Sequence, residues 1–328
     1  MPASSNLRLS VAELLATAAR RPQAEALRHK RRGVWLAWSW AEVLAQADQL
    51  GEALRSRGVG AGSVVAVSGE YAPTLALVAI AATHLGADVR TVPTQLGRVA
   101  LAEWVAKHRP ALVFLGQRNQ VGPWRAALDR AALAAPLVLD AQLPWGHPGS
   151  AGFTPAGDLL GAAGGVPARN SSDVLWIEEA TDWADGLSYI LQAAASGRAI
   201  AFPESRLAAH RDRRETQPVA AAVSPPHQAA LSADLAARLP TGPGVAARLT
   251  RAALEAGRGG RAGWPQRWLL RRLRRPYGLA RLRELIVVGA DGQEAADDLF
   301  AALGITRSYA SPPAADAARA APHGLAYA

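Results

Sequence analysis

Two kinds of pattern alternate along this chain. Short runs rich in β-branched and other apolar residues, typical of buried strands, are separated by longer stretches with helical spacing. Alternation of this kind is typical of parallel sheets covered by helices, so the sequence predicts an α/β protein with two units, each built on its own sheet. The expected strands lie near residues 63–68, 87–92, 111–115 and 136–139 in the first unit, and near 174–177, 198–202, 219–223 and 284–288 in the second.

The N-terminal residues carry start signals for two helices and a hairpin. A Ser followed three residues later by Glu occurs at Ser10–Glu13 and at Ser39–Glu42, and this spacing predicts a capping box that opens a helix. Between the two boxes, residues 26–29 and 34–38 flank a basic turn closed by Gly33, which predicts a β-hairpin.

Composition indicates where the two units are divided. Residues 141–172 are rich in Gly, Pro and Ala, as linkers are, and the tail is rich in Ala and Pro. The expected division is an N-terminal α/β subdomain over 1–150, a linker over 151–172, a second α/β subdomain over 173–311 and a disordered tail over 312–328.

The charge and the apolar content limit the function classes. The chain has 328 residues, a formal net charge of +9 and no cysteine, which excludes disulfides and thiolate metal sites. No signal peptide is visible and the most apolar stretch, Ala72–Ala87, is too short to cross a bilayer, so we expect a soluble, cytoplasmic protein. A basic chain suits acidic partners, but no signature of a nucleic-acid module accompanies the charge, so we expect no nucleic-acid partner.

Several passages carry a recognisable order along the chain. They are Gly33–Val43, Gly58–Val67 and Leu85–Pro93 in the first half, and Trp183–Tyr189, Ser196–Ser205, Ser224–His227 and Tyr277–Ala290 in the second. In this order they resemble the adenylate-forming (AMP-binding) superfamily, and within it the long-chain fatty-acid–CoA ligases. No single passage would suffice, but the shared order of many weak motifs makes the resemblance specific.

The resemblance implies a fold, a reaction and a set of site residues. The fold is a large domain of two stacked α/β subdomains, and in the reaction a fatty acid attacks ATP before CoA displaces AMP. Gly289, Ala290 and Tyr309 would lie at the adenine loop, and His227 would lie near the acyl and nucleotide sites, although a structural role is the favoured one for His227. The chemistry requires backbone N–H groups around phosphate, a carboxylate on Mg²⁺ and a mobile Lys.

The sequence departs from the family at each of these requirements. The phosphate loop is expected just after residues 173–176, but the chain continues directly into Ile177–Asp182. Pro312 and Pro313 replace the family's Thr and Glu beyond Tyr309, and no Lys follows Lys107. The family's small C-terminal domain is expected to be absent. We therefore assign no catalytic residue, and expect ATP, Mg²⁺ and CoA as cofactors only if the chain is an active ligase.

Four carboxylates occupy the place of the expected phosphate loop: Glu178, Glu179, Asp182 and Asp185. They would repel a triphosphate in the absence of metal ions. A metal cluster is one interpretation, but Asp and Glu favour the first turns of helices. The sequence therefore favours a solvated acidic helix start, and we assign no metal site.

The segment 264–275 combines aromatic and basic residues. Its members of interest are Trp264, Trp268, Arg271, Arg272, Arg274 and Arg275. Trp anchors at the depth of lipid headgroups and Arg pairs with phosphate, so an anionic membrane surface is a candidate partner. The apolar residues do not keep to one clean face, so a solvated or partner-facing helix is the favoured interpretation.

Three functions remain open from the sequence. The first is a truncated, catalytically inactive relative of fatty-acid–CoA ligases, a pseudoenzyme of fatty-acid metabolism that binds a fatty acyl chain or a protein partner. The second is a divergent but active fatty-acyl-CoA synthetase, and the third is a peripheral membrane scaffold. ATP-dependent thioester formation separates the second from the others, and liposome binding separates the third.

Overall fold

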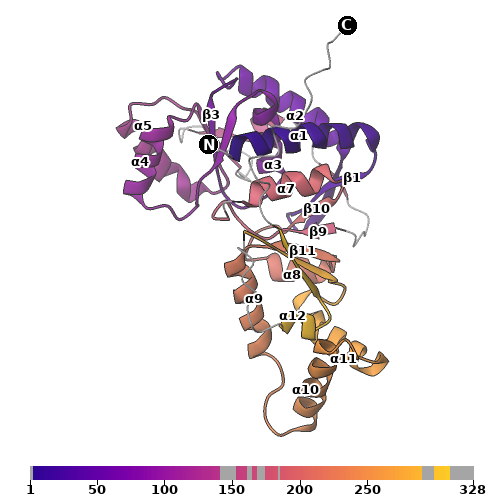
Figure 1. Cartoon of the computed structure of the whole chain (residues 1–328). Helices are drawn as coiled ribbons and strands as arrows, with labels where there is room; N and C mark the ends of the chain where they lie inside the picture. Colours follow the sequence, from indigo (N-terminus) through magenta and orange to yellow (C-terminus); the bar gives the residue numbers. More distant parts are fainter. Residues whose placement is uncertain are drawn as a thin grey trace.

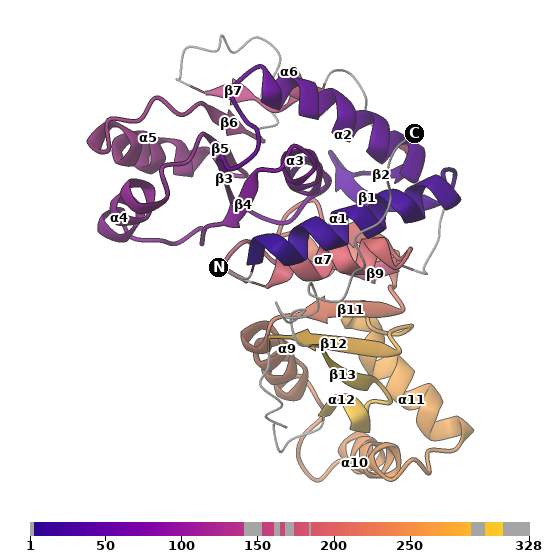
Figure 2. The same cartoon turned by 45° about the horizontal axis from the view of Figure 1, so that its top comes forward.

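The computed structural model describes residues 3–140, 153–160, 165–167, 174–183, 185–289 and 299–310. Two sheets organise these residues. Most of the first half of the chain lies together with α7 in one part of the molecule, and α8 to α12 extend from it as a second part (Figures 1 and 2). The fold is mixed α/β with largely parallel sheets, as the sequence predicted.

The smaller sheet has five parallel strands in the order β4-β3-β5-β6-β7. The strands are β3 (Val64–Ser68), β4 (Asp88–Thr91), β5 (Leu112–Leu115), β6 (Leu137–Leu139) and β7 (Thr154–Pro155). The first four confirm the strands expected in the first unit. Helices cover both faces of this sheet, so its inner strands β3, β5 and β6 are mostly apolar along their length and do not alternate apolar with polar residues.

The larger sheet has eight strands in the order β13-β12-β11-β9-β10-β1-β2-β8. Neighbours from β13 to β1 pair in parallel, whereas β2 is antiparallel to both β1 and β8. The strands are β1 (Glu25–Arg31), β2 (Val34–Ser39), β8 (Val166–Pro167), β9 (Val174–Trp176), β10 (Ala199–Phe202), β11 (Ala220–Val223), β12 (Glu284–Val288) and β13 (Thr306–Ala310). The four strands expected in the second unit are thus confirmed.

Helices fill the space between and outside the sheets. The helices that precede β9 in the sequence are α1 (Ala3–Arg20), α2 (Trp40–Arg55), α3 (Pro73–His84), α4 (Arg98–His108), α5 (Val121–Arg130) and α6 (Gly157–Leu160). Those that follow are α7 (Gly186–Ala195), α8 (Ala209–Thr216), α9 (Pro225–Ala237), α10 (Val245–Arg258), α11 (Trp264–Arg274) and α12 (Leu299–Ala302). Two 3₁₀ turns are η1 (Arg118–Gln120) and η2 (Arg275–Tyr277).

The core has three parts that follow these layers. The largest part contains residues of α1, α2, α3 and α7 together with strands of both sheets, and α1 lies along α7 (Figure 2). A second part lies between the larger sheet and α8 to α12, and a third lies between the smaller sheet and the pair α4 and α5. The shared central part joins the two sheets into one body.

The predicted hairpin forms, but it joins the larger sheet. β1 and β2 pair as expected, and β1 also pairs in parallel with β10, with Leu27 opposite Ile200. A buried ion pair holds it there, because Nζ of Lys30 lies 3.1 Å from Oδ1 of Asp212 and 2.5 Å from Oε2 of Glu215 in α8. The larger sheet therefore takes two strands from the first 40 residues, and the division at residue 150 stays a prediction.

Of the two predicted capping boxes, the one at Ser39 is confirmed and the one at Ser10 is wrong. Ser39 caps α2 as predicted, since its hydroxyl accepts from the Glu42 N–H and the Glu42 carboxylate accepts from the Ser39 N–H. Ser10, however, lies inside α1 and is buried, because the helix already begins at Ala3. Apolar contacts of the preceding turn, including Leu7, extend this helix beyond the local start signal.

Some predictions fall on residues outside the described ranges. Half of the linker over 151–172 lies outside, as does the tail over 312–328. Among the described residues, no helix combines the length and the apolar character that crossing a membrane requires.

Candidate functional site

The parallel strands of the larger sheet direct several polar residues to one edge. Glu178 follows β9, Ser224 follows β11 and Gly289 follows β12, so all three lie at the carboxyl ends of neighbouring strands. In open α/β sheets, ligands bind at this edge, because loops diverge there and helices begin. This carboxyl edge is therefore the candidate functional site.

Glu178 is the centre of a buried polar network at this edge. Its Oε1 atom is contacted by Nη1 of Arg213 and lies 2.8 Å from Nε2 of His227. Its Oε2 atom accepts a 2.6 Å hydrogen bond from the indole Nε1 of Trp176. The Glu178 side chain is only 6% exposed, so a cation and two hydrogen-bond partners compensate a charge that water cannot reach.

This network shifts the pKa values of its members. Burial alone would raise the pKa of Glu178, but the Arg213 guanidinium, the His227 ring and the Trp176 indole together lower it to about 2. Burial likewise works against a charged His227, yet the hydrogen bond that the ring donates to Glu178, together with the charge of that carboxylate, raises the pKa of the imidazole above its usual value. The geometry therefore favours an ionised Glu178 next to a readily protonated His227.

The neighbouring residues join the two sheets. The Glu179 carboxylate accepts from the Ser224 N–H at 2.7 Å, while its backbone carbonyl accepts from the Tyr71 N–H at 2.9 Å. Thr181 is buried, and its hydroxyl accepts from the Gly69 N–H at 3.0 Å and donates to the Val92 carbonyl at 2.7 Å. Residues 178–181 thus form a closed seam between the carboxyl ends of the two sheets.

This seam corrects the sequence-based interpretation of the acidic residues. Glu178 and Glu179 are buried, not solvated, and Asp182 accepts hydrogen bonds from the N–H and hydroxyl of Thr94. No group of three potential metal ligands occurs within the described part of the chain. Sequence reasoning missed Arg213 as the partner of Glu178, because no spacing in the sequence relates α8 to the end of β9.

The predicted nucleotide positions lie at the far side of the same edge. Gly289 has a positive φ of 91°, and a Cβ placed on it would lie 3.2 Å from Oδ2 of Asp185, so the backbone approaches that carboxylate closely. Tyr309 lies on β13 opposite Val287, is 38% exposed, and has the Arg307 guanidinium 5.9 Å from its ring centroid. Ala290 lies outside the described residues. An adenine ring on Tyr309 stays a prediction.

His227 occupies the first turn of α9 and faces the Glu178 network. Ser224 caps this helix by accepting from the His227 N–H, and Pro225 begins it. The structure therefore brings His227 into contact with Glu178, and the structural role that the sequence favoured stays a prediction. Contact with a substrate stays a prediction for this residue.

A small polar cavity lies on the other side of the seam, where the carboxyl ends of both sheets meet. Its volume is about 140 Å³, and its lining includes His29, Trp38, Glu70 and Asp140. Burial lowers the pKa of His29 to about 4 and raises the pKa of Asp140 above its usual value. We call this the junction cavity.

The basic segment divides into exposed and buried residues. Trp264 and Trp268 of α11 are 75% and 54% exposed, and Arg271, Arg272 and Arg275 are also exposed. Arg274 is 7% exposed and donates to the Leu282 carbonyl at 3.1 Å, so it stabilises the packing of α11 and contributes little to an outer surface. Membrane contact through this helix stays a prediction.

Comparisons with known proteins agree with this architecture. Residues 14–150 match the family model described as AMP-binding enzyme. Among solved structures, an acyl-CoA synthetase from Brucella canis has 17% identity and a TM-score of 0.63 over 92% of this chain and 57% of that one. The adenylation domain of a carboxylate reductase from Mycobacterium chelonae has 11% identity and a TM-score of 0.67 over 93% and 57%.

A third solved structure contains a nucleotide. The A-PCP didomain of a carboxylic acid reductase from Segniliparus rugosus, in complex with AMP, has 13% identity and a TM-score of 0.64 over 93% of this chain and 52% of that one. No curated protein sequence matches the chain. The chain spans 52% to 57% of the length of these three structures, and at such identities the likeness shows the fold.

Proposed function

We propose that this chain belongs to the AMP-binding superfamily, whose family model its residues 14–150 match, and that it is a binding protein that does not adenylate carboxylic acids. It is similar to acyl-CoA synthetases in architecture. The proposal concerns what happens at the carboxyl edge of the larger sheet, where the superfamily resemblance predicts nucleotide chemistry.

The closed seam over residues 178–181 is the observation that carries the proposal. A triphosphate needs free backbone N–H groups and positive charge around it. Here the N–H groups of Ile177, Thr181 and Trp183 donate to backbone carbonyls at 2.9–3.0 Å. The side chains at the same place are the carboxylates of Glu178 and Glu179, which repel phosphate. Because these N–H groups already have acceptors and the nearby side chains are negative, the seam stabilises the fold and offers no binding site for a triphosphate.

The junction cavity bears on the choice of ligand. Pockets for drug-sized ligands have volumes of roughly 300–1,000 Å³, and the junction cavity, at about 140 Å³, is smaller. A long acyl chain would not fit without rearrangement. Exposed apolar residues on α10 and α11, namely Val245, Leu249, Trp264 and Trp268, instead favour a protein partner, because such residues mark interaction surfaces.

ATP–pyrophosphate exchange tests the proposal directly. Purified protein should show no exchange above background with fatty acids of short, medium or long chain in the presence of Mg²⁺. Exchange that follows the protein through purification and is lost in Tyr309→Ala would contradict the proposal and favour the divergent, active synthetase with ATP, Mg²⁺ and CoA. Tyr309→Phe is the matched control, because it keeps the ring that would stack on adenine.

A further inference from the structure

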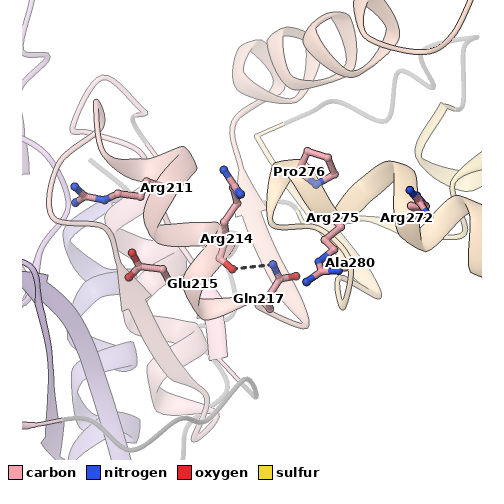
Figure 3. A pocket seen from close by; sticks show the side chains of 8 residues that line it. All are labelled: Arg211, Arg214, Glu215, Gln217, Arg272, Arg275, Pro276 and Ala280. Carbon is pink, nitrogen blue, oxygen red and sulfur yellow. Dashed lines mark hydrogen bonds between the residues drawn. The ribbon is translucent and has the colours of Figure 1, made fainter.

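A pocket of about 1030 Å³ opens between α8 and η2, and arginines dominate its lining (Figure 3). We call it the arginine pocket. Gln217 leads into β11 and Ala280 precedes β12, so the pocket lies at the amino ends of these strands. The candidate site, marked by Ser224 and Gly289, is at the opposite edge of the sheet. The lining residues are Arg211, Arg214, Glu215, Gln217, Arg272, Arg275, Pro276 and Ala280.

The positive charge of this pocket is largely uncompensated. Its carboxylate, Glu215, already pairs with Lys30 at 2.5 Å and accepts from the Trp35 indole at 3.1 Å. Arg211 pairs with acidic residues of its own surroundings at 3.0 Å. For the remaining three arginines of the lining, no carboxylate among the described residues lies within ion-pair distance. They are Arg214, Arg272 and Arg275.

Helix ends explain part of this charge but not its arrangement. Arg214 and Arg272 lie in the last turns of α8 and α11, where cations stabilise the exposed carbonyl groups. Arg275 lies beyond α11, in the η2 turn. The helix-end effect also gives no reason why arginines from two distant segments line one pocket, and Figure 3 shows Arg211 and Arg214 on one side of it and Arg272 and Arg275 on the other.

The two walls of the pocket are fixed to each other. Nε of Arg213, next to Arg214 in α8, donates to the Tyr277 carbonyl of η2 at 2.7 Å. Gly278 follows η2 with a φ of 71°, and a Cβ there would lie 2.5 Å from the Arg213 carbonyl carbon. Backbone packing therefore fixes the spacing between the two segments that carry the arginines.

We infer that the arginine pocket binds an anion that carries several phosphate groups. Guanidinium groups bind phosphate oxygens with paired, charge-assisted hydrogen bonds. Three such groups without a carboxylate partner suit a ligand with more than one phosphate, and the volume accommodates a molecule of nucleotide size. The site is independent of the proposed function, because it uses none of the residues at the carboxyl edge.

Calorimetric titration with sodium tripolyphosphate tests this site on the full chain. Two triple variants remove the same charge from different surfaces, and the arginines of the control are exposed on α10, outside the pocket lining. The pocket variant is Arg214→Gln with Arg272→Gln and Arg275→Gln, and the control is Arg248→Gln with Arg251→Gln and Arg258→Gln.

Wild-type protein should bind tripolyphosphate saturably, and the pocket variant should bind at least about tenfold more weakly. The control should stay within about twofold, since separated surface charges contribute little. Equal weakening in both variants, or no saturable binding to wild type, would overturn the inference.

A second arm distinguishes a free phosphate compound from a lipid headgroup. Coenzyme A and phosphatidylglycerol vesicles are each titrated with and without tripolyphosphate. Competition between tripolyphosphate and coenzyme A supports a small-molecule site. Binding to vesicles that tripolyphosphate does not displace, without saturable binding of either soluble compound, would overturn it. Circular dichroism and urea unfolding of the variants exclude loss of folding as the cause.

Discussion

The Nε2 atom of His227 lies 2.8 Å from the Oε1 atom of Glu178, and Arg213 contacts the same carboxylate oxygen. One buried carboxylate thus links the start of α9, the end of β9 and α8. This relationship holds three elements of the larger sheet together at its carboxyl edge. Because Glu178 and His227 both titrate, the free energy of unfolding should depend on pH, and the directions of their pKa shifts determine how.

The free energy of unfolding should change with pH as Glu178 and His227 titrate. The pKa of Glu178 is lowered to about 2, so its contribution is present above its ordinary value of 4.5 and is lost as pH falls toward 2. The pKa of His227 is raised, so its contribution is complete below its ordinary value of 6.5 and is lost as pH rises through the raised value. These two groups therefore contribute most between pH 4.5 and pH 6.5.

Urea unfolding of wild type and His227→Gln across this range measures the effect. The variant should lose the decline in unfolding free energy above pH 6.5 and keep the decline at acidic pH. An NMR titration of the His227 ring gives its pKa independently. A ring that titrates below 6.5 would contradict the assignment.

Glu178→Gln should destabilise the protein strongly at neutral pH. The change leaves the buried Arg213 guanidinium without its carboxylate, and breaking a buried ion pair from one side costs about 3–5 kcal/mol. Glu52→Gln is the matched control, because its pair with Arg55 is exposed and worth at most about 1 kcal/mol. Equal unfolding free energies for the two variants would show that the Glu178 network is not compensated as we describe.

Thr181→Val tests the seam between the sheets. The substitution keeps the shape of the side chain but leaves the Gly69 N–H and the Val92 carbonyl without a partner, which should cost about 1–3 kcal/mol. Thr94→Val removes a hydroxyl bonded to Asp182 at an exposed position and should cost less. Urea denaturation compares them, and a larger loss in Thr94→Val would argue against a buried seam.

Lys30→Met tests the attachment of the hairpin to the larger sheet. The change leaves the buried Asp212 carboxylate without its Lys partner, so we expect a loss of about 3 kcal/mol or more. Arg90→Met, in a partly exposed pair with Asp88 of the smaller sheet, should cost at most about 1 kcal/mol. A negligible effect of Lys30→Met on urea unfolding would place the hairpin elsewhere.

Trp268→Ala should leave stability nearly unchanged. The ring is about half exposed, so the loss should be less than about 1 kcal/mol, whereas Trp176→Ala in the buried core should cost about 3–5 kcal/mol. Thermal unfolding compares the two variants. Co-sedimentation with phosphatidylglycerol vesicles then tests whether the exposed ring contacts a membrane. Loss of vesicle binding in Trp268→Ala would favour the membrane scaffold over a protein partner.

The sequence alone determined the α/β class, the expected strands of both sheets and the helix of the basic segment, α11. These features are local, because apolar periodicity and capping residues act over one or two turns. The capping box at Ser39 was predictable for this reason, whereas the box at Ser10 was overridden by packing of the preceding turn.

Only the tertiary structure decided that the N-terminal hairpin joins the larger sheet and which charges meet. Pairing of β1 with β10, and of Glu178 with Arg213 and His227, joins residues that no sequence spacing relates. Glu178 and Glu179 looked solvated in the sequence because their partners come from α8 and from the start of α9. A buried charge without a partner is costly, and the fold removes that cost by bringing partners from distant segments to these carboxylates. For this reason the role of each carboxylate depends on the tertiary structure and not on the local sequence.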